Sequence, residues 1–273
     1  MTQRRRSTLF VGGLALDALP AALASGADLV CIDLEDAVPP ERKDEARAAV
    51  VEALASLSVP AGVQLISRIN AMGSIEGPVD LRALATESPV RGLLLPKVET
   101  ADEVRRAGDA LDELGARIDL YAIIETPEGL EHCMAIGRGH PRLKALFFGG
   151  FDLSTALGCA MAWEPLLYAR SRVVHAAAGA GIECLDSPYA DIADLDGLRE
   201  SCGRIKALGM TGRAAKHASQ VEAINAAFTP TAAELDRARR IVEAFRADPT
   251  RPLVFDGKLV ELPTIKRMEK LVG

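Results

Sequence analysis

The stretch AIIETPEGLEHCMAIGRGHPRLKALFFGGFDL, residues 122–153, decides the fold. Two short apolar runs, 121–124 and 145–148, lie in or at the edge of this stretch, and each leads to a carboxylate, Glu125 and Asp152. The segment between the two runs has helical character. The order is therefore strand, helix, strand, with an acid after each strand. In a parallel sheet the carboxyl ends of such strands lie on the same edge, so we expect the two acids to be neighbours.

Two carboxylates on neighbouring strand ends suit Mg²⁺, which often takes one or two protein carboxylates and completes its shell with water and substrate. We therefore predict that Glu125 and Asp152 are ligands of Mg²⁺. The alternative is that both are solvent-facing acids, because loops commonly carry such residues.

The composition limits the classes of protein that remain. A chain of 273 residues with 49% hydrophobic content can bury a large core, either as one barrel or as two domains. The formal charge of −6 and a pI near 5.4 argue against a nucleic-acid-binding protein.

The first residues do not predict an export signal. The arginines at 4–6 precede the apolar stretch LFVGGLALDAL, but Asp17 interrupts it and no convincing cleavage site follows. No run of about 18 apolar residues exists that would span a membrane. The five cysteines are odd in number and lack CxxC spacing, which is typical of reduced thiols. We expect a cytoplasmic protein.

Apolar runs of about four to six residues alternate with helical stretches along the chain, which indicates a parallel sheet. The expected strands are 8–11, 29–34, 63–69, 92–95, 118–124, 145–148, 182–185 and 212–215. The expected helices are 16–24, 41–57, 79–85, 101–114, 127–136, 165–178, 195–208 and 221–227. Eight such units predict an α/β fold, a closed (β/α)₈ TIM barrel. An open doubly wound sheet is the alternative, although the chain has no GxGxxG phosphate loop.

The last part of the chain does not continue the βα alternation. We expect an amphipathic helix at 232–245, a hairpin around Asp256-Gly257 and a short helix at 265–271. We therefore assign residues 1–230 to the barrel and 231–273 to a C-terminal helix-hairpin-helix extension. Because the barrel is already complete, this extension must cap it as a lid or reach a neighbouring subunit.

Active sites of TIM barrels lie at the C-terminal ends of the strands. The polar residues expected there are Glu35, Asp36, Arg68, Asn70, Lys97, Glu125, Asp152, Asp186 and His217. The set combines acids that hold a cation with cations that hold an anion. A metal ion together with a guanidinium can chelate and polarise an α-keto acid.

Several of these residues also have a purely structural interpretation when taken singly. Arg68 can be a structural salt bridge, and Lys97 a solvated residue of the rim. Asp186 can cap a turn, and His217 can cap the helix that follows it or bond a backbone group. Their convergence on one rim favours the functional interpretation.

Nine motifs occur in an order that resembles a known family. They are LFVGG, DLEDAVPP with Lys43 after it, RIN at 68–70, LPKVE at 95–99, IET at 124–126, FGGFDL at 148–153, LLYARS at 166–171, HASQVEAINAAFTPT at 217–231 and FDGKLVELP at 255–263. Together they resemble the citrate lyase β-subunit-like branch of the HpcH/HpaI aldolase/citrate lyase family. The resemblance covers nearly the whole chain.

The resemblance implies a (β/α)₈ barrel that uses Mg²⁺ to cleave β-hydroxyacyl thioesters, of the citryl, malyl or citramalyl type, into an acyl thioester and a keto acid. The carrier is coenzyme A or an acyl carrier protein. By resemblance, Glu125 and Asp152 hold the metal and Arg68 binds the keto acid or carbonyl oxygen. Glu35 and Asp36 are placed near the metal-bound waters and counted as catalytic. We add Lys97, Gly150 and Phe151 as substrate-binding residues.

The resemblance also implies a role for the tail. In the family this segment covers the active site of an adjacent subunit, and an acid in it, usually Asp, protonates the enolate. Here that acid is Glu261. We therefore expect a homo-oligomer, a trimer or hexamer, with Glu261 as a catalytic residue. The alternative is a solvated Glu on a surface hairpin.

Other functions stay open. Pyruvate aldolases of the superfamily carry Glu-His after the second strand, so the pair Glu35-Asp36 disfavours a coenzyme-A-independent aldolase. An acyl-CoA thioesterase, a carrier-dependent citryl lyase subunit and a non-catalytic acyl-CoA-binding barrel remain as alternatives.

The sequence also departs from the family pattern. The positions concerned are Gly12-Gly13 for Pro-Gly, Phe151 for a small or acidic residue before the metal-binding Asp, Arg213 for Lys, Lys216-His217-Ala218 for Ile-His-Pro, and Glu261 for Asp. These departures leave the metal site intact and bear on the acyl group and the carrier.

Overall fold

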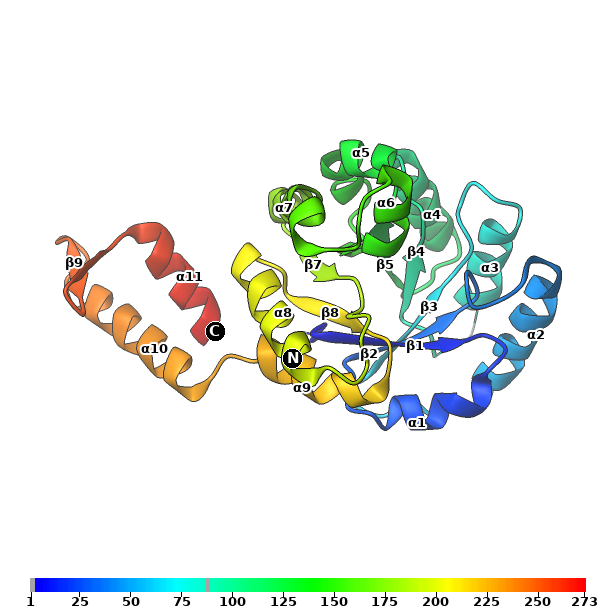
Figure 1. Ribbon diagram of the computed structural model, residues 1–273, viewed down its shortest axis with the longest axis horizontal. Coiled ribbons are helices and arrows are strands. Elements are labelled where there is room, and N and C mark those ends of the chain that lie inside the picture. Colours follow the sequence, from blue (N-terminus) through cyan, green and yellow to red (C-terminus); the bar gives the residue numbers. More distant parts are fainter. Residues whose placement is uncertain (1–2, 87–88) are drawn as a thin grey trace. The chain divides into compact units, whose positions relative to one another are not determined.

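The computed structural model describes residues 3–86 and 89–273. Over that part of the chain, eight parallel strands close into a barrel in sequence order (Figure 1). They are β1 Ser7–Gly12, β2 Leu29–Asp33, β3 Gln64–Arg68, β4 Gly92–Leu95, β5 Asp119–Ile124, β6 Leu143–Phe148, β7 Glu183–Asp186 and β8 Gly212–Ala215. β1 pairs with both β2 and β8, which closes the ring. The (β/α)₈ prediction is confirmed, and the open sheet is wrong.

Helices surround the strand ring on its outer side (Figure 1). They are α1 Leu19–Leu23, α2 Lys43–Leu54, α3 Glu76–Ala85, α4 Ala101–Glu113, α5 Pro127–Gly137, α6 Gly150–Leu157, α7 Trp163–Ala180, α8 Leu195–Leu208 and α9 Val221–Phe228. Three short 3₁₀ helices, η1 Leu16–Ala18, η2 Pro40–Arg42 and η3 Ala218–Gln220, precede α1, α2 and α9.

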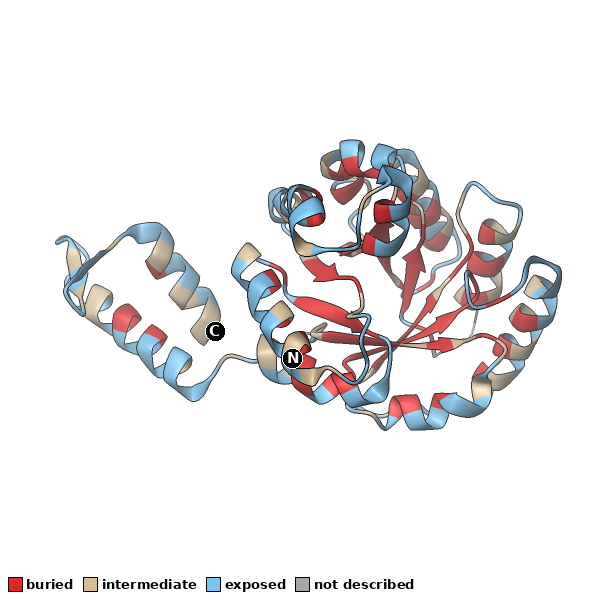
Figure 2. Cartoon of the chain, in the orientation of Figure 1, coloured by how far each residue is buried: buried red, intermediate tan, exposed pale blue. Residues whose placement is uncertain are grey.

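The strands bury both faces, as Figure 2 shows by their colour. In β2, Leu29 and Cys31 belong to the cluster inside the barrel, while Val30 and Ile32 belong to the layer between strands and helices. This alternation follows from the two-residue period of a strand. It explains why the strands read as continuous apolar runs rather than as alternating patterns.

Tyr121 occupies the inside of the barrel and is fully buried. Its hydroxyl donates to Gln64 Oε1 at 3.0 Å and accepts from Arg5 Nε at 2.9 Å, so its polar atom is satisfied. The ring fits because Gly92 lies next to it. A Cβ on Gly92 would approach Tyr121 Cε2 to 2.5 Å and Ile66 Cγ2 to 2.8 Å.

We expect Gly92→Ala to lower the free energy of unfolding by about 2 kcal/mol, the usual cost of overpacking a well-filled core. Urea denaturation followed by circular dichroism measures it. Gly203→Ala is the matched control, because nothing lies within 4 Å of its added Cβ and the residue is in helix α8. That variant should be about 0.5–1 kcal/mol more stable than wild type. A Gly92→Ala chain as stable as wild type would contradict this expectation. It would show that the Tyr121 ring can move aside at little cost in free energy.

One helix was not expected. Residues 150–157 form α6, which begins directly after Gly149 and ends at the left-handed Gly158. The pair Gly149-Gly150 resembles a loop in the sequence, yet the chain turns straight from β6 into a helix there. Two smaller differences occur earlier, where η1 and η2 form the first turns of the segments expected as single helices.

A second compact unit runs from Thr229 to Gly273. It contains α10 Ala232–Ala247, the antiparallel pair β9 Leu253–Phe255 and β10 Lys258–Val260, and α11 Leu262–Val272. Thr231 and Glu234 form a capping box that begins α10. The helix-hairpin-helix prediction is confirmed. Within the described residues, no helix combines the length and apolar character needed to cross a membrane.

Candidate active site

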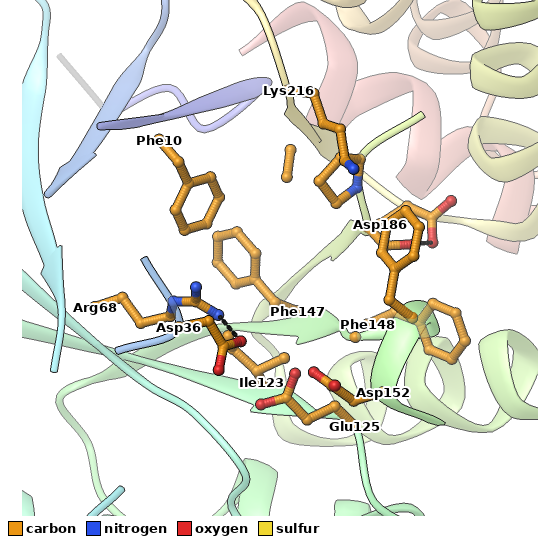
Figure 3. Close-up of a pocket in the computed structure, with 15 residues that line it drawn as sticks. Phe10, Asp36, Arg68, Ile123, Glu125, Phe147, Phe148, Asp152, Asp186 and Lys216 are labelled. Atoms are coloured by element: carbon orange, nitrogen blue, oxygen red, sulfur yellow. Dashed lines mark hydrogen bonds and ion pairs between the residues drawn. The ribbon is translucent and has the colours of Figure 1, made fainter. Parts of the chain in front are cut away.

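A cavity of about 230 Å³ lies at the C-terminal ends of the barrel strands (Figure 3). Aromatic and aliphatic side chains form much of its wall, and charged groups enter from several strand ends. Its lining comprises Phe10, Asp36, Arg68, Ile123, Glu125, Phe147, Phe148, Gly149, Phe151, Asp152, Asp186, Ser187, Pro188, Ala214 and Lys216. Ile123 and Phe147 also belong to the inner barrel core, so the packed core forms part of the cavity wall.

Glu125 and Asp152 face each other at one side of the cavity (Figure 3). Glu125 is 3% exposed, whereas Asp152 is exposed. Burial raises the pKa of Glu125 to about 8; the Lys97 N–H opposes the rise, and the Asp152 carboxylate adds to it. Neither acid forms an ion pair with a cation among the described residues. The protein therefore neutralises little of the negative charge of these two acids, and the pair can bind a cation.

The local sequence explains how the two acids meet. Ile124 of β5 pairs with Phe148 of β6, which places Glu125 beside Gly149. A Cβ on Gly149 would come within 2.4 Å of the Glu125 Cβ, so only glycine permits this approach. Helix α6 then begins at once and carries Asp152 in its first turn.

Glu125 is also fixed from the other side. Thr126 caps α5 by accepting from the Gly129 N–H at 3.0 Å, and Pro127 fills the first turn of the helix. The Lys97 N–H donates to Glu125 Oε1 at 2.8 Å. Lys97 has a left-handed backbone with φ of 51°, which is uncommon outside glycine. The carboxylate therefore occupies a defined position.

Arg68 ends β3 and lines the same cavity as Glu125 and Asp152 (Figure 3). Its Nε donates to Asp33 Oδ1 at 2.8 Å and its Nη2 to Asp33 Oδ2 at 2.6 Å. Asp33 ends β2 and is the register partner of Arg68. This two-pronged pair holds the guanidinium plane, and the Nη1 edge also meets Glu35 at 2.9 Å and Asp36 at 3.4 Å.

Lys97 belongs to the same network. Its ammonium forms an ion pair with Glu35 and a longer one with Asp36 at 3.4 Å. Burial raises the pKa of Glu35, although the Arg68 charge and the Lys97 hydrogen bond oppose the rise. Burial also acts to raise the pKa of Asp36, but Arg68 and the hydrogen bonds around it outweigh burial and lower the value. The structure thus places Glu35, Asp36 and Lys97 around Arg68.

Three rim residues have structural partners. His217 caps η3 by accepting from the Ser219 N–H at 3.2 Å, as the alternative interpretation expected. Asp186 is fully buried and pairs with Arg170 Nε at 3.1 Å and Arg213 Nη2 at 2.6 Å. Asn70 donates to the Leu34 carbonyl at 3.1 Å.

The remaining predicted residues lie in two places. Phe151 lines the cavity, whereas Gly150 is buried, and a Cβ there would meet Met161 and Phe148. Glu261 belongs to the second unit, where it is exposed at the start of α11. Its catalytic role remains a prediction.

Sequence reasoning missed several residues of the site, among them Asp33, Lys216 and Phe10. Asp33 holds Arg68, and its signal was an acid near the end of an apolar run, the same signal that identified Glu125. Lys216 and Phe10 both line the cavity. Lys216 had a signal, since it occupies a position where the family has an apolar residue.

The donor set favours a hard cation. Two carboxylates, one buried and one exposed, lie together, and within the described residues no group of three or more His, Cys, Asp or Glu side chains could hold a metal. Two protein oxygens leave most of an octahedral shell for water and substrate. Arg68 lines the same cavity, and a guanidinium can bind an anionic oxygen.

The profile of the HpcH/HpaI aldolase/citrate lyase family matches residues 6–218. The chain belongs to this family. The family prediction is therefore confirmed, and the match covers all eight barrel strands.

Individual members of the HpcH/HpaI family are similar along nearly the full chain. Citrate lyase subunit beta of Escherichia coli strain K12 is 33% identical over 97% of this chain and 91% of its own length. The (3S)-malyl-CoA thioesterase of Cereibacter sphaeroides strain ATCC 17029 is 32% identical over 94% and 89%. The crystal structure of CitE from Mycobacterium tuberculosis with magnesium, acetoacetate and coenzyme A has a TM-score of 0.80 and 28% identity, covering 98% of this chain and 97% of that one.

Proposed function

We propose that this chain is a Mg²⁺-dependent carbon–carbon lyase that cleaves a β-hydroxyacyl thioester into an acyl thioester and a keto acid. One observation carries the proposal. Glu125 and Asp152 lie together without a cation partner among the described residues, and Arg68 lines the same cavity (Figure 3). This arrangement suits a metal-chelated keto acid that is held at its other side by a guanidinium.

The site residues fit Mg²⁺. Burial and the nearby Asp152 carboxylate raise the pKa of Glu125, and a divalent cation bound between the two acids would favour their charged forms. Glu125 and Asp152 would hold it through hard oxygen atoms. When bound, Mg²⁺ polarises the oxygens of the keto-acid half and favours loss of the hydroxyl proton.

The remaining steps need a base, a positive charge near the thioester oxygen and an acid. A base removes the substrate hydroxyl proton, the bond between the hydroxyl-bearing carbon and the thioester α-carbon breaks, and the hydroxyl oxygen becomes the keto group. The electron pair moves into a thioester enolate. Arg68, held by Asp33, supplies positive charge near the forming oxyanion. An acid then protonates the enolate carbon, which gives the acyl thioester.

The relatives support this reaction class. They include proteins named for citrate lyase and malyl-CoA thioesterase activity, and the M. tuberculosis structure contains magnesium together with coenzyme A. We propose coenzyme A thioesters and a keto acid as the small-molecule partners of this chain. The thioesterase relative favours a second candidate in the same site, in which water attacks the thioester carbonyl and releases the acid and the free thiol.

A panel of β-hydroxyacyl-CoA esters, incubated with the purified chain and Mg²⁺, tests the proposal. Release of a keto acid and an acyl-CoA supports the lyase, and release of free coenzyme A with the intact hydroxy acid supports the thioesterase. Turnover of a free hydroxy-keto acid without thioester would indicate an aldolase. Turnover only of an acyl-carrier-protein ester would indicate a carrier-dependent subunit. Binding without any turnover would leave a non-catalytic barrel and overturn the proposal.

We further propose that the chain is a homo-oligomer, a trimer or hexamer, in which Glu261 of one subunit protonates the enolate in the site of the next. Glu261→Gln should slow cleavage and α-proton exchange of the acyl-CoA product by about 10²-fold, because an amide cannot deliver the proton. Proton exchange followed by NMR measures the step directly. Mg²⁺ binding should stay unchanged. Glu243→Gln, an exposed acid on α10, is the matched control.

Mixed oligomers test whether the site is shared. Glu261→Gln subunits combined with Arg68→Ala subunits should recover part of the activity after subunit exchange, because some interfaces then pair two intact halves. A strictly monomeric protein, or mixed oligomers without any recovery, would contradict the shared site.

A further inference from the structure

A second cavity, of about 300 Å³, adjoins the active-site cavity on the side of helices α7 and α8. Its wall comes from α7 and the residues before it, the loop after β7, helix α8 and the side chain of Arg213 on β8. The linings of the two cavities share one described residue, Pro188. The metal-binding acids line only the first cavity. The second is therefore a separate hollow in the barrel domain.

Three buried charged side chains lie where the two cavities adjoin. Asp186 lines the active-site cavity (Figure 3), and its two partners, Arg170 and Arg213, line the second one. The exposed fractions of the three residues are 0%, 5% and 3%. Both guanidinium groups are permanently charged, and one carboxylate cancels only one of them. The cluster thus leaves one positive charge in excess, and a buried charge is costly unless it is paired.

The two arginines differ in how far the protein satisfies their donors. Arg213 donates to Asp186 Oδ2 at 2.6 Å, to the Ser187 carbonyl at 3.1 Å and to Ser201 Oγ at 2.9 Å. Arg170 donates from Nε to Asp186 Oδ1 at 3.1 Å, and its buried Nη1 has no hydrogen-bond partner among the described residues. A buried donor without an acceptor is costly. The excess charge and the unmet donor therefore coincide at Arg170, which lines the cavity.

Other groups of the cavity wall suit an anion. Arg204 of α8 lies 4.3 Å from the centre of the Trp163 ring, which holds its guanidinium at the wall. Its carboxylate contact within the described part of the chain is a long one, to Glu164 at 3.7 Å. Ser201 accepts one hydrogen bond, and its hydroxyl donates to none of the described residues. Glu200 also lines the cavity, and its charge opposes an anion there.

We infer that this cavity binds a small phosphate-type oxyanion, at a site separate from the metal site. A tetrahedral anion has several acceptor oxygens, which suit the guanidiniums of Arg170 and Arg204 and the hydroxyl of Ser201. It also supplies the negative charge that the buried cluster lacks. The class comprises inorganic phosphate and the phosphate group of a small metabolite. The inference does not depend on the proposed function, because binding requires no turnover.

Calorimetric titration of the full chain with inorganic phosphate, in excess chelator and at fixed ionic strength, tests the site. We expect saturable binding of one phosphate per chain and weaker binding of acetate, which offers fewer acceptor oxygens and less charge. Arg204→Met should weaken phosphate binding about tenfold, the size of one lost charge-assisted contact. Glu200→Gln should tighten it about threefold, because the substitution removes a repelling charge at the wall.

Arg199→Met is the matched control. It removes the same charge from α8, but that arginine is exposed, pairs with Asp196 at 2.7 Å and does not line the cavity. Its dissociation constant should equal that of wild type. Arg170→Lys keeps the charge but loses the unpartnered nitrogen, and should weaken binding by about tenfold or more. If circular dichroism shows that this variant does not fold, the opposite shifts of Arg204→Met and Glu200→Gln decide, since both residues are exposed.

Glycerol 3-phosphate distinguishes the two sources of the anion. Tighter binding than that of inorganic phosphate supports the site and assigns it to a phosphorylated metabolite. Weaker but saturable binding supports the site and assigns it to the free ion.

Three results would overturn the inference. The first is a wild-type chain without saturable phosphate binding. The second is an equal loss in Arg199→Met and Arg204→Met, or no gain in Glu200→Gln, since either would indicate a general effect of surface charge. The third is displacement of phosphate by coenzyme A, or loss of binding in Arg68→Ala but not in Arg204→Met, which would place the anion in the active-site cavity. A chain that binds phosphate as expected yet cleaves no thioester contradicts only the proposed function.

Discussion

Glu125→Gln is expected to abolish Mg²⁺-dependent cleavage, with a fall in kcat of about 10³-fold or more. The substitution keeps the shape of the side chain and its acceptor for the Lys97 N–H, but removes the charge that binds the cation. A bound metal ion contributes several kcal/mol of transition-state stabilisation, which this change forfeits. Asp152→Asn should have a similar effect. Steady-state kinetics and calorimetric titration with Mg²⁺ measure both losses.

The fold of the Glu125→Gln variant should be intact. In metal-free wild type, the pKa of Glu125 is raised to about 8, so the unfolded chain loses this proton at a lower pH than the folded chain. That difference costs stability increasingly as the pH rises from the unfolded value toward 8. In excess chelator the Gln variant should therefore unfold at no lower temperature than wild type, with the largest advantage at pH 8 and above. Glu128→Gln, an exposed neighbour in α5, is the control.

Full activity of Glu125→Gln, or of wild type in excess chelator, would contradict the prediction that the site binds a metal ion.

Arg68→Lys is expected to lower kcat/KM by about 10²- to 10³-fold although the charge is kept. The guanidinium uses two nitrogens on Asp33 and presents its Nη1 edge to Glu35 and Asp36. A lysine ammonium is a compact charge without the planar fork of a guanidinium. It cannot bond both oxygens of Asp33 in the way that Arg68 does. The oxyanion then loses a preoriented donor.

Steady-state kinetics on the thioester that turns over best measures this effect. Arg199→Lys is the control, because that arginine is exposed on α8 and pairs with Asp196 at 2.7 Å. Near-wild-type kcat/KM in Arg68→Lys would show that Arg68 serves only as a structural salt bridge.

The barrel was predictable because its signals are local. Buried parallel strands are apolar on both faces and therefore appear as short apolar runs, and helices appear between them. β4 and α8 were predicted with the bounds that the structure has, Gly92–Leu95 and Leu195–Leu208. Helix α6 was missed because two consecutive glycines, such as those at its start, usually indicate a loop. Here the two glycines allow close packing. Gly149 is required by the Glu125 side chain, which lies 24 residues earlier in the chain.

The sequence by itself determined the barrel, the family and the two carboxylates that follow β5 and β6. Each of these depends on residues that are adjacent in the chain or on motifs in a fixed order. Only the tertiary structure decided which charges are engaged and which remain free. In the sequence, three charged residues at strand ends look alike: Arg68, Asp186 and Lys216. In the structure, Asp33 orients Arg68, and two arginines neutralise Asp186. Lys216 lines the cavity and has no carboxylate partner among the described residues. The physical reason is that an ion pair depends on distances between strands, and closure of the barrel sets those distances.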